Sequence, residues 1–318
     1  MIRSLAAVSA LVLLLLTGCS AGPAASASGP SLDTIFGPVQ VPAAPQRVVA
    51  LGWGDAEAAL AVGVAPVGAS DWLAFGGEGV GPWAAGRYPT PPQITGTLDI
   101  DYEQVAALRP DVILWTRSDN TEDTYRRLSR IAPTVAAPAA VANAYGTTWD
   151  QQARLVASAV GRPAEGEALV DRVEQKFAAV RAKHPSWAGR TATIGVRNAD
   201  RYAAYVPGGT RADFVTALGF VINPEIVREN ARNFSVTLGT ENVGRLDADI
   251  VLLSLIGASG DQVRNDPLVQ RMPSFRDGRF IVLEDKTVAR AFSAATALGT
   301  EYALDTTVPL IEKALPGT

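Results

Sequence analysis

The chain has 318 residues, of which 47% are hydrophobic and 19% are charged, a balance that is ordinary for a well-packed globular protein. Its formal net charge of −4 at pH 7 gives no basic footprint of the kind that nucleic-acid-binding proteins carry, so we expect no nucleic-acid partner. One cysteine and one histidine exclude an internal disulfide, a Cys/His zinc cluster and an HExxH metal site.

The N-terminus has the features of an exported lipoprotein, with a signal peptide over residues 1–18. Arg3 precedes an uncharged apolar run, Leu5 to Leu16, that is shorter than the about 20 residues a bilayer span needs. The following LTGC resembles a bacterial lipobox, in which Cys19 is lipidated and becomes the mature N-terminus. An ordinary signal peptide is the alternative, but the lone cysteine then has no purpose. We therefore expect a lipid on Cys19 to hold the protein at the extracytoplasmic face of the cell membrane.

Residues 19–35 are small, polar and nearly uncharged, which predicts a flexible tether. From residue 36 to residue 162, short apolar strands alternate with helices. The predicted strands are residues 48–51, 65–70, 111–116 and 133–138, and the predicted helices are residues 54–64, 101–110, 121–131 and 147–161. This alternation is typical of βαβ units with a mostly parallel sheet and predicts a Rossmann-like N-terminal lobe.

A single long helix is predicted over residues 163–185, with Leu169, Val173 and Phe177 at helical spacing and a proline at each end. At 1.5 Å per residue it forms a rod roughly 30 Å long, which we interpret as the connection between two lobes. The lone histidine, His184, is expected on its surface. Strand and helix patterns resume over residues 186–318, which predicts a second Rossmann-like lobe that ends in an amphipathic helix.

One segment occurs twice. DYEQVAALRPDVIL, residues 101–114, and GTENVGRLDADIVL, residues 239–252, align at a constant offset of 138 residues. The identical pairs include Glu103/Glu241 and Asp111/Asp249. Each predicted lobe therefore carries one copy, with a glutamate at the start of an equivalent helix. A helix dipole stabilises such a glutamate without any partner, so the pattern alone gives it no further role.

The sequence offers no set of catalytic groups. His184 lies at the end of the long helix and not at a strand end, where a triad histidine is expected. No Walker A pattern or GxGxxG occurs between a strand and a helix, and the glycine-rich residues 76–83 are predicted to form a loop. These absences favour a binding protein over an enzyme.

Four segments, VPAAPQRVVALGWGDAEAALAVGVAPVGAS, DYEQVAALRPDVIL, RIAPTV and TTWDQQARLVASAVGRP, occur in this order. Together they resemble the siderophore- and cobalamin-type substrate-binding proteins of bacterial ABC importers over residues 40–315. The resemblance implies two Rossmann-like lobes, one rigid connecting helix and a ligand cleft between the lobes. It also implies that Glu103 and Glu241 contact basic residues on the two halves of a dimeric permease.

The candidate ligand-binding residues are aromatic and arginine side chains near predicted strand ends, because ligands of open α/β sheets bind there. Aromatic rings can stack on a flat chelate, and arginine pairs with an anionic one. Packing in the core is the alternative for each aromatic residue. The set comprises Trp53, Trp72, Trp83, Arg87, Tyr88, Trp115, Arg117, Arg197, Tyr205, Arg290 and Phe292.

A ferric siderophore is the expected ligand, since such a complex already holds its metal and the chain is nearly free of histidine. We therefore expect no metal ligands and no cofactor in the protein, which should act as a monomer. Cobalamin and haem remain alternative ligands. An exported enzyme or a partner-binding lipoprotein on the same fold is the alternative class of function.

Overall fold

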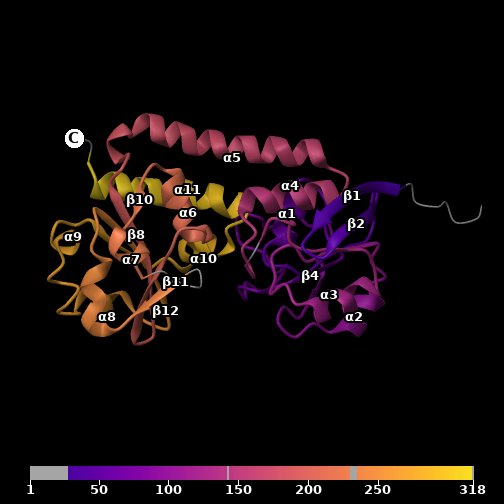
Figure 1. The fold of residues 1–318 in the computed structure, drawn as a ribbon, viewed down its shortest axis with the longest axis horizontal. Coiled ribbons are helices and arrows are strands. Elements are labelled where there is room, and N and C mark those ends of the chain that lie inside the picture. Colours follow the sequence, from indigo (N-terminus) through magenta and orange to yellow (C-terminus); the bar gives the residue numbers. More distant parts are fainter. Residues whose placement is uncertain (1–27, 142, 230–234, 317–318) are drawn as a thin grey trace, which may run out of the picture.

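The computed structural model describes residues 28–141, 143–229 and 235–316, and the expected signal peptide and Cys19 lie outside these ranges. Two α/β lobes lie side by side, and the long helix α5 (Pro163–Lys183) runs across both along one side (Figure 1). The expected fold class is thereby confirmed. A second long helix, α11 (Ala297–Ala314), runs beside α5, so the lobes share two long helices and not one.

The expected tether is wrong for its last residues. Strand β1 (Ser28–Thr34) pairs antiparallel with β2 (Gly37–Pro42) across a turn at Ile35 and Phe36. Gly37, which follows the turn, has a φ of 98° that suits glycine. Leu32 and Val41 bury their side chains from this hairpin. Backbone pairing and two buried apolar side chains are enough to order a segment that composition alone assigns to a linker.

The N-terminal lobe has a five-stranded, fully parallel sheet in the order β5-β4-β3-β6-β7. The apolar strands VVA and VIL are wholly buried, as central strands of parallel sheets are when helices cover both faces. The strands are β3 (Val48–Ala50), β4 (Gly68–Ser70), β5 (Gln93–Thr95), β6 (Val112–Leu114) and β7 (Thr134–Val135), and the helices are α1 (Asp55–Ala61), α2 (Tyr102–Ala107), α3 (Glu122–Ser129) and α4 (Trp149–Ala159).

The C-terminal lobe has a mixed sheet in the order β11-β9-β8-β12-β13, with β10 also paired to β8. Strands β9 and β11 are antiparallel to their neighbours, so this lobe is less regular than expected. Its strands are β8 (Thr191–Asn198), β9 (Arg201–Tyr205), β10 (Val221–Ile222), β11 (Ser235–Leu238), β12 (Ile250–Ile256) and β13 (Phe280–Leu283). Its helices are α6 (Thr210–Ala217), α7 (Pro224–Val227), α8 (Gly260–Arg264), α9 (Pro273–Arg276) and α10 (Lys286–Ala294), with 3₁₀ helices η1 (Pro185–Trp187) and η2 (Thr240–Leu246).

The repeated segment has a structural role in each lobe. The Asp111 carboxylate accepts hydrogen bonds from the backbone N–H of Gln46 at 2.7 Å and of Arg47 at 3.0 Å, just before β3. Asp249 accepts from the backbone N–H and the hydroxyl of Thr191, both at 2.8 Å, at the start of β8. Each repeated aspartate thus ties its own strand to the parallel neighbour. The helix of the second copy is a 3₁₀ helix, whereas that of the first copy is an α-helix.

Helices α5 and α11 run parallel and are joined by ion pairs on their exposed sides. These are Arg172–Glu301 at 2.9 Å, Lys176–Asp305 at 3.3 Å and Lys183–Glu312 at 2.8 Å. The expected surface position of His184 is wrong in detail. Its ring stacks on Trp187 with centroids 4.1 Å apart and its Nε2 lies 2.7 Å from Glu312, so it caps this helix pair.

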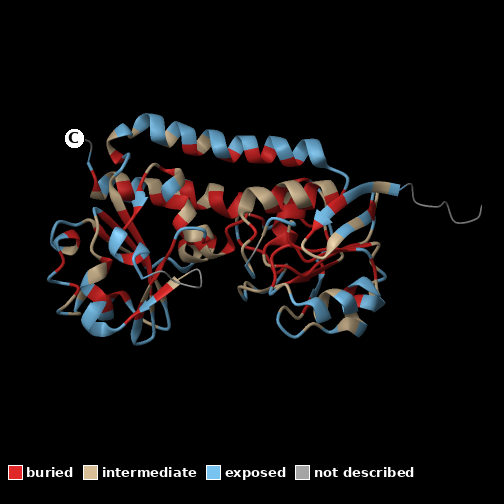
Figure 2. Cartoon of the chain, viewed as in Figure 1, coloured by how far each residue is buried: buried red, intermediate tan, exposed pale blue. Residues whose placement is uncertain are grey.

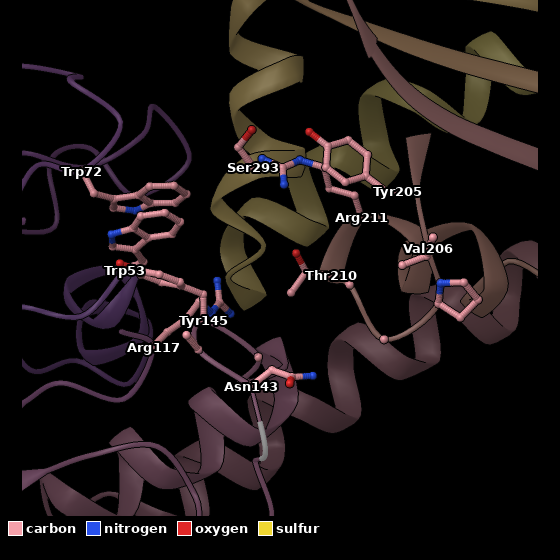
Figure 3. Close-up of a pocket in the computed structure, with 15 residues that line it drawn as sticks. Trp53, Trp72, Arg117, Asn143, Tyr145, Tyr205, Val206, Thr210, Arg211 and Ser293 are labelled. Carbon is pink, nitrogen blue, oxygen red and sulfur yellow. The ribbon is translucent and has the colours of Figure 1, made fainter. Parts of the chain in front are cut away.

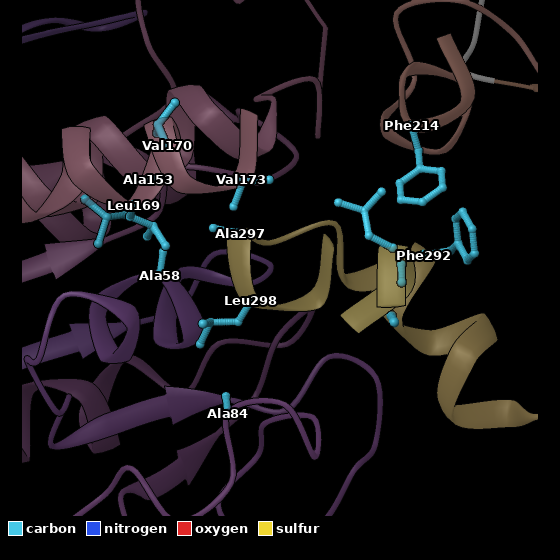
Figure 4. Close-up of a cluster of buried hydrophobic side chains, with 14 of the residues drawn as sticks. Ala58, Ala84, Ala153, Leu169, Val170, Val173, Phe214, Phe292, Ala297 and Leu298 are labelled. Carbon is cyan, nitrogen blue, oxygen red and sulfur yellow. The ribbon is translucent and has the colours of Figure 1, made fainter. Parts of the chain in front are cut away.

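One apolar core extends from the N-terminal lobe, beneath α4, α5 and α11, into the C-terminal lobe. The outer face of α5 is exposed and its inner face is buried (Figure 2). Leu169 and Val173 of α5, Ala297 and Leu298 of α11, and Phe292 of α10 belong to this core (Figure 4). Because the core is continuous, the two lobes are held together by packing as well as by chain connectivity.

Candidate ligand-binding site

A cavity of about 430 Å³ lies between the two lobes, beyond the C-terminal ends of β3, β4 and β6 in the N-terminal lobe and of the antiparallel strand β9 in the C-terminal lobe. Its volume is in the range of small-molecule sites, and in the N-terminal lobe its position is the one that open α/β sheets use for ligands. The N-terminal lobe contributes Trp53, Trp72, Arg117 and residues 143–146, and the C-terminal lobe contributes residues 205–211 and Ser293 (Figure 3).

Three stacked rings, Trp72, Trp53 and Tyr145, form the N-terminal side of the cavity, which we call the aromatic wall (Figure 3). The indoles of Trp53 and Trp72 lie 4.2 Å apart and 8° from parallel, and Tyr145 stacks on Trp53 at 4.1 Å. Tyr145 has a φ of 58°, and its N–H donates to the Ser118 carbonyl at 2.7 Å. The wall offers a flat, polarisable surface to a ligand.

Arg117 lies at the floor of the cavity and is 3% exposed. Its Nε donates to the Thr147 carbonyl at 3.0 Å, and its two terminal nitrogens donate to the carbonyls of Ala294 and Ala295, each at 2.8 Å. The last two carbonyls belong to the end of α10 in the other lobe. Burial lowers the pKa of Arg117 to about 10, so the side chain is still a cation at neutral pH. It therefore binds the lobes together where it lines the site.

Asp55, at the start of α1, lies behind Arg117 and is fully buried. It accepts hydrogen bonds from the Thr116 N–H at 2.9 Å and from Gln152 Nε2 at 2.7 Å. Burial raises the pKa of the Asp55 carboxyl, while these hydrogen bonds and the charge of Arg117 oppose the rise.

Glu57 is the second buried carboxyl behind the site. It accepts hydrogen bonds from Trp83 Nε1 at 2.7 Å, from the Gly81 N–H at 3.1 Å and from the Thr296 hydroxyl at the start of α11. Burial raises its pKa, again against the effects of its hydrogen bonds and of Arg117. The Thr296 contact is a second polar link between the lobes.

Arg211, in the first turn of α6, supplies a second cation from the opposite side of the cavity. Its guanidinium lies 4.6 Å from the centre of the Tyr205 ring. Burial lowers its pKa as well. No carboxylate is present among the described residues that line the cavity.

A comparison of the sequence with known families decides what kind of protein holds this cavity. Residues 48–287 match the family model described as periplasmic binding protein, which spans most of the chain. The chain belongs to the periplasmic binding protein family.

Individual relatives of this periplasmic binding protein support the assignment. It is 24% identical over 227 residues to the probable siderophore-binding lipoprotein YfiY of Bacillus subtilis (strain 168), covering 66% of this chain and 64% of that protein, slightly less than two thirds of the relative's length. It is similar to a periplasmic solute binding protein from Mycobacterium smegmatis, with 29% identity, a TM-score of 0.79 and coverage of 91% of this chain and 99% of that one. It is also similar to Streptococcus pneumoniae TIGR4 PiaA in complex with ferrichrome, with 26% identity, a TM-score of 0.75 and coverage of 89% and 98%.

Four of the residues expected to bind ligand line the cavity of this periplasmic binding protein: Trp53, Trp72, Arg117 and Tyr205. Each lies at or just beyond the end of a strand, namely β3, β4, β6 and β9. The rule that ligand-binding residues follow strand ends therefore identified these four residues from the sequence.

The other expected residues of the N-terminal lobe lie outside the cavity. Trp83 is bound to Glu57, and Arg87 is exposed. Tyr88 is buried, and its hydroxyl has no hydrogen-bond partner among the described residues. Trp115 is 3% exposed and packs in the core on the other face of the sheet. Trp115 therefore packs in the core, which was the alternative to ligand binding for each aromatic residue.

The remaining expected residues of the C-terminal lobe are also outside the cavity. Arg197 lies over the Tyr202 ring at 4.4 Å. Phe292 is buried against Phe214, in the core below the site. Arg290 lies 5.2 Å from the ring centre of Phe75 and so contacts the loop of the opposite lobe that carries Trp72. Arg290 is thus beside the site without lining it.

Sequence reasoning missed Tyr145, Thr210, Arg211 and Ser293, which all line the cavity. The Gly208–Gly209 pair between β9 and α6 is a signal that could have found two of them. Glycines at such a turn let the backbone approach a ligand, and the first turn of the next helix then faces the same space. Tyr145 and Ser293 have no comparable signal.

Proposed function

We propose that this protein captures a ferric siderophore in the cavity between its lobes and delivers it to an ABC permease. The observation that carries the proposal is the composition of the cavity, with an aromatic wall, two guanidiniums and no carboxylate among its described lining residues. Flat aromatic chelates stack on such a wall, and anionic complexes pair with arginine. Membership of a binding-protein family and similarity to a ferrichrome-bound structure support it.

Iron is proposed to arrive already chelated, so that the protein needs no metal ligands or cofactor of its own. Within residues 28–141, 143–229 and 235–316, no group of three or more His, Cys, Asp or Glu is placed to hold a metal ion. Among the described residues that line the cavity, no nucleophile lies beside a general base. Both observations support a binding function without catalysis.

Delivery requires a surface for the permease. Glu103 and Glu241 lie in the first turns of α2 and η2, one in each lobe, and both side chains are exposed. We propose that they pair with basic residues on the two halves of a dimeric permease, with the protein acting as a monomer. Rim carboxylates of this kind mainly set the register and rate of association.

We also propose that a lipid on Cys19 anchors the protein at the extracytoplasmic face of the membrane. Among the helices that the structure describes, none is both long enough and apolar enough to cross a membrane. The YfiY relative is itself named a lipoprotein, which supports an anchor of this type.

Native mass spectrometry tests the proposed ligand. The purified protein is incubated with medium from an iron-starved culture, supplemented with ferric chloride, and the bound mass is measured. A retained ferric chelate is the expected result. Retention of haem or cobalamin from a defined mixture, with no ferric chelate bound, would replace the ligand while leaving the transport role. No retained small molecule from either source would contradict the proposal.

A further inference from the structure

Trp72 belongs to the aromatic wall, but it lies in a loop with little regular structure of its own. This loop, residues 71–79, follows β4 and contains three glycines with a positive φ, namely Gly76, Gly77 and Gly79. Glycines permit such a backbone and also leave it free to adopt others. Trp72 is half-buried and stacks on Trp53 (Figure 3). The position of its ring therefore depends on what else holds the loop.

The loop is closed by Asp71, the residue directly before Trp72. Its carboxylate accepts hydrogen bonds from the backbone N–H of Phe75 at 2.8 Å and of Gly76 at 2.7 Å. The ring of Phe75 also meets that of Trp83 edge-on, with centroids 5.6 Å apart. Because two hydrogen bonds tie Phe75 to the residue beside Trp72, a contact that holds Phe75 also restrains Trp72.

A further contact of Phe75 comes from the other lobe. The guanidinium of Arg290, in α10, lies 5.2 Å from the centre of the Phe75 ring, which is within the range of a cation–π interaction. The end of α10 is itself fixed, because Arg117 donates hydrogen bonds to the carbonyls of Ala294 and Ala295. Arg290 is about one helical turn before these carbonyls, so it reaches Phe75 from an anchored helix. Arg290 does not line the cavity.

We propose that Arg290 is a positioning residue for the ligand site: by holding Phe75, it keeps Trp72 stacked in the aromatic wall. A contact from the C-terminal lobe thus completes the N-terminal side of the site, and parting the lobes at this point would free Trp72. The effect on ligand affinity rests on the proposed siderophore function, whereas the effect on the loop needs no ligand.

Hydrogen exchange followed by mass spectrometry tests the effect on the loop in ligand-free protein. Arg290→Met removes the cation and Phe75→Leu removes the ring. The matched control is Lys286→Met, because Lys286 is an exposed cation in the first turn of the same helix and does not line the cavity. An exposed cation–π contact is worth about a twofold to fivefold change in an equilibrium constant, so exchange of residues 71–76 should rise by about that factor in both variants and not in the control.

Two results would overturn the positioning role. Unchanged exchange of residues 71–76 in the variants would show that Arg290 does not hold the loop. A rise spread equally over both lobes, including the buried strand β12, would indicate general destabilisation. Should Arg290→Met fail to fold, Phe75→Leu decides, because it breaks the same contact from the other side.

Titration calorimetry with ferrichrome tests the effect on the site. Ferrichrome is a neutral ferric tris-hydroxamate, so a loss of affinity for it does not report attraction between Arg290 and an anion. Arg290→Met should weaken binding about twofold to fivefold, Arg290→Lys should recover part of the loss, and Lys286→Met should change nothing. In a Trp72→Ala background Arg290→Met should have no further effect, because Arg290 acts through Trp72.

An undiminished effect of Arg290→Met in the Trp72→Ala background would overturn the proposal, since Arg290 would then act on the ligand by another route. Wild-type protein that retains no ferric chelate in native mass spectrometry would instead refute the proposed function. The two failures are distinguishable, because the exchange measurement decides the role of Arg290 without any ligand.

Discussion

Replacing Arg117 by methionine should remove a polar link between the lobes while keeping much of the buried apolar volume. The wild-type guanidinium donates to the carbonyls of Thr147, Ala294 and Ala295 at 2.8–3.0 Å, and two of these acceptors lie in the opposite lobe. The side chain is 3% exposed, so in the wild-type protein little water reaches these acceptors. The variant would leave three carbonyls and two buried carboxyl groups without their cation.

The expected cost follows from these contacts. A buried acceptor left without its donor costs about 1–3 kcal/mol, and such losses around one side chain do not add fully. We therefore expect the free energy of unfolding to fall by about 3–5 kcal/mol. At about 2–4 °C per kcal/mol for a chain of this size, the melting temperature should fall by roughly 10 °C.

The loss should also grow as the pH rises. Burial already raises the pKa of Asp55 and Glu57, and Arg117 opposes that rise. Without Arg117 their folded-state pKa values rise further above those of the unfolded chain. A carboxyl with a raised folded-state pKa loses stability as the pH rises towards that value, so Arg117→Met should be less destabilised at pH 5 than at pH 7.

Arg154→Met is the matched control in the same lobe. Arg154 pairs with Asp150 at 2.9 Å and Glu167 at 3.0 Å, but its side chain is 38% exposed. Exposed ion pairs contribute little, so this variant should lose less than about 1 kcal/mol. Thermal unfolding followed by circular dichroism at both pH values compares the two. Equal losses in the two variants, or a loss below 1 kcal/mol in Arg117→Met, would refute the assignment of Arg117 as the inter-lobe link.

Three further predictions follow from other parts of the chain. Cys19→Ser should leave the precursor unprocessed or release the protein from membranes, as seen by fractionation and immunoblotting. Glu103→Ala/Glu241→Ala should bind ferric chelate and melt nearly as wild type, because exposed helix-terminal charges contribute at most about 1 kcal/mol, but should fail to support uptake in cells. Gly54→Ala should lose about 2–4 kcal/mol and Gly63→Ala about 1 kcal/mol by chemical denaturation, because both have a φ of 81° but only at Gly54 would a Cβ lie 2.4 Å from a threonine methyl of the opposite lobe.

The contradicting outcomes are distinct for each. Unchanged processing and membrane association in Cys19→Ser would contradict the proposed lipid anchor. Normal uptake by the double glutamate variant would mean that both residues only stabilise their helix ends. Lost ligand affinity would mean that they contribute to ligand binding and not to permease docking. Equal losses at the two glycines would mean that the close approach at Gly54 is easily relieved.

The fold was predictable because the apolar runs before Gly52 and Trp115 are short, β-branched or aliphatic, and followed by helical periodicity. The hairpin over residues 28–42 was not, because it buries few apolar side chains, such as Leu32 and Val41, and is otherwise ordered by the pairing of its two strands. The second shared helix was recognised only as amphipathic. Nothing in its own sequence indicates that it packs against α5, because the partners in each ion pair are 129 residues apart in the chain.

The site was predictable where a side chain follows a strand end directly. That rule fixes where the backbone lies but not which way the side chain points, so Trp115 enters the core although it follows β6 as Arg117 does. Arg211 lies in a helix turn, and Tyr145 depends on a left-handed backbone conformation in a loop. The position of Tyr145 depends on contacts with Trp53 and Ser118, which are distant in sequence, whereas Arg211 contacts the nearby Tyr205.

Tryptophan fluorescence titration tests the central claim most directly, because two of the six tryptophans stand in the aromatic wall. Ferric siderophores, haem and cobalamin are each added to wild type, to Trp72→Ala and to Trp187→Phe, whose residue is buried away from the cavity beside His184. We expect saturable quenching by a ferric siderophore that is weaker in Trp72→Ala and unchanged in affinity in Trp187→Phe. Quenching by none of the ligands, or quenching that depends on Trp187 and not on Trp72, would contradict it.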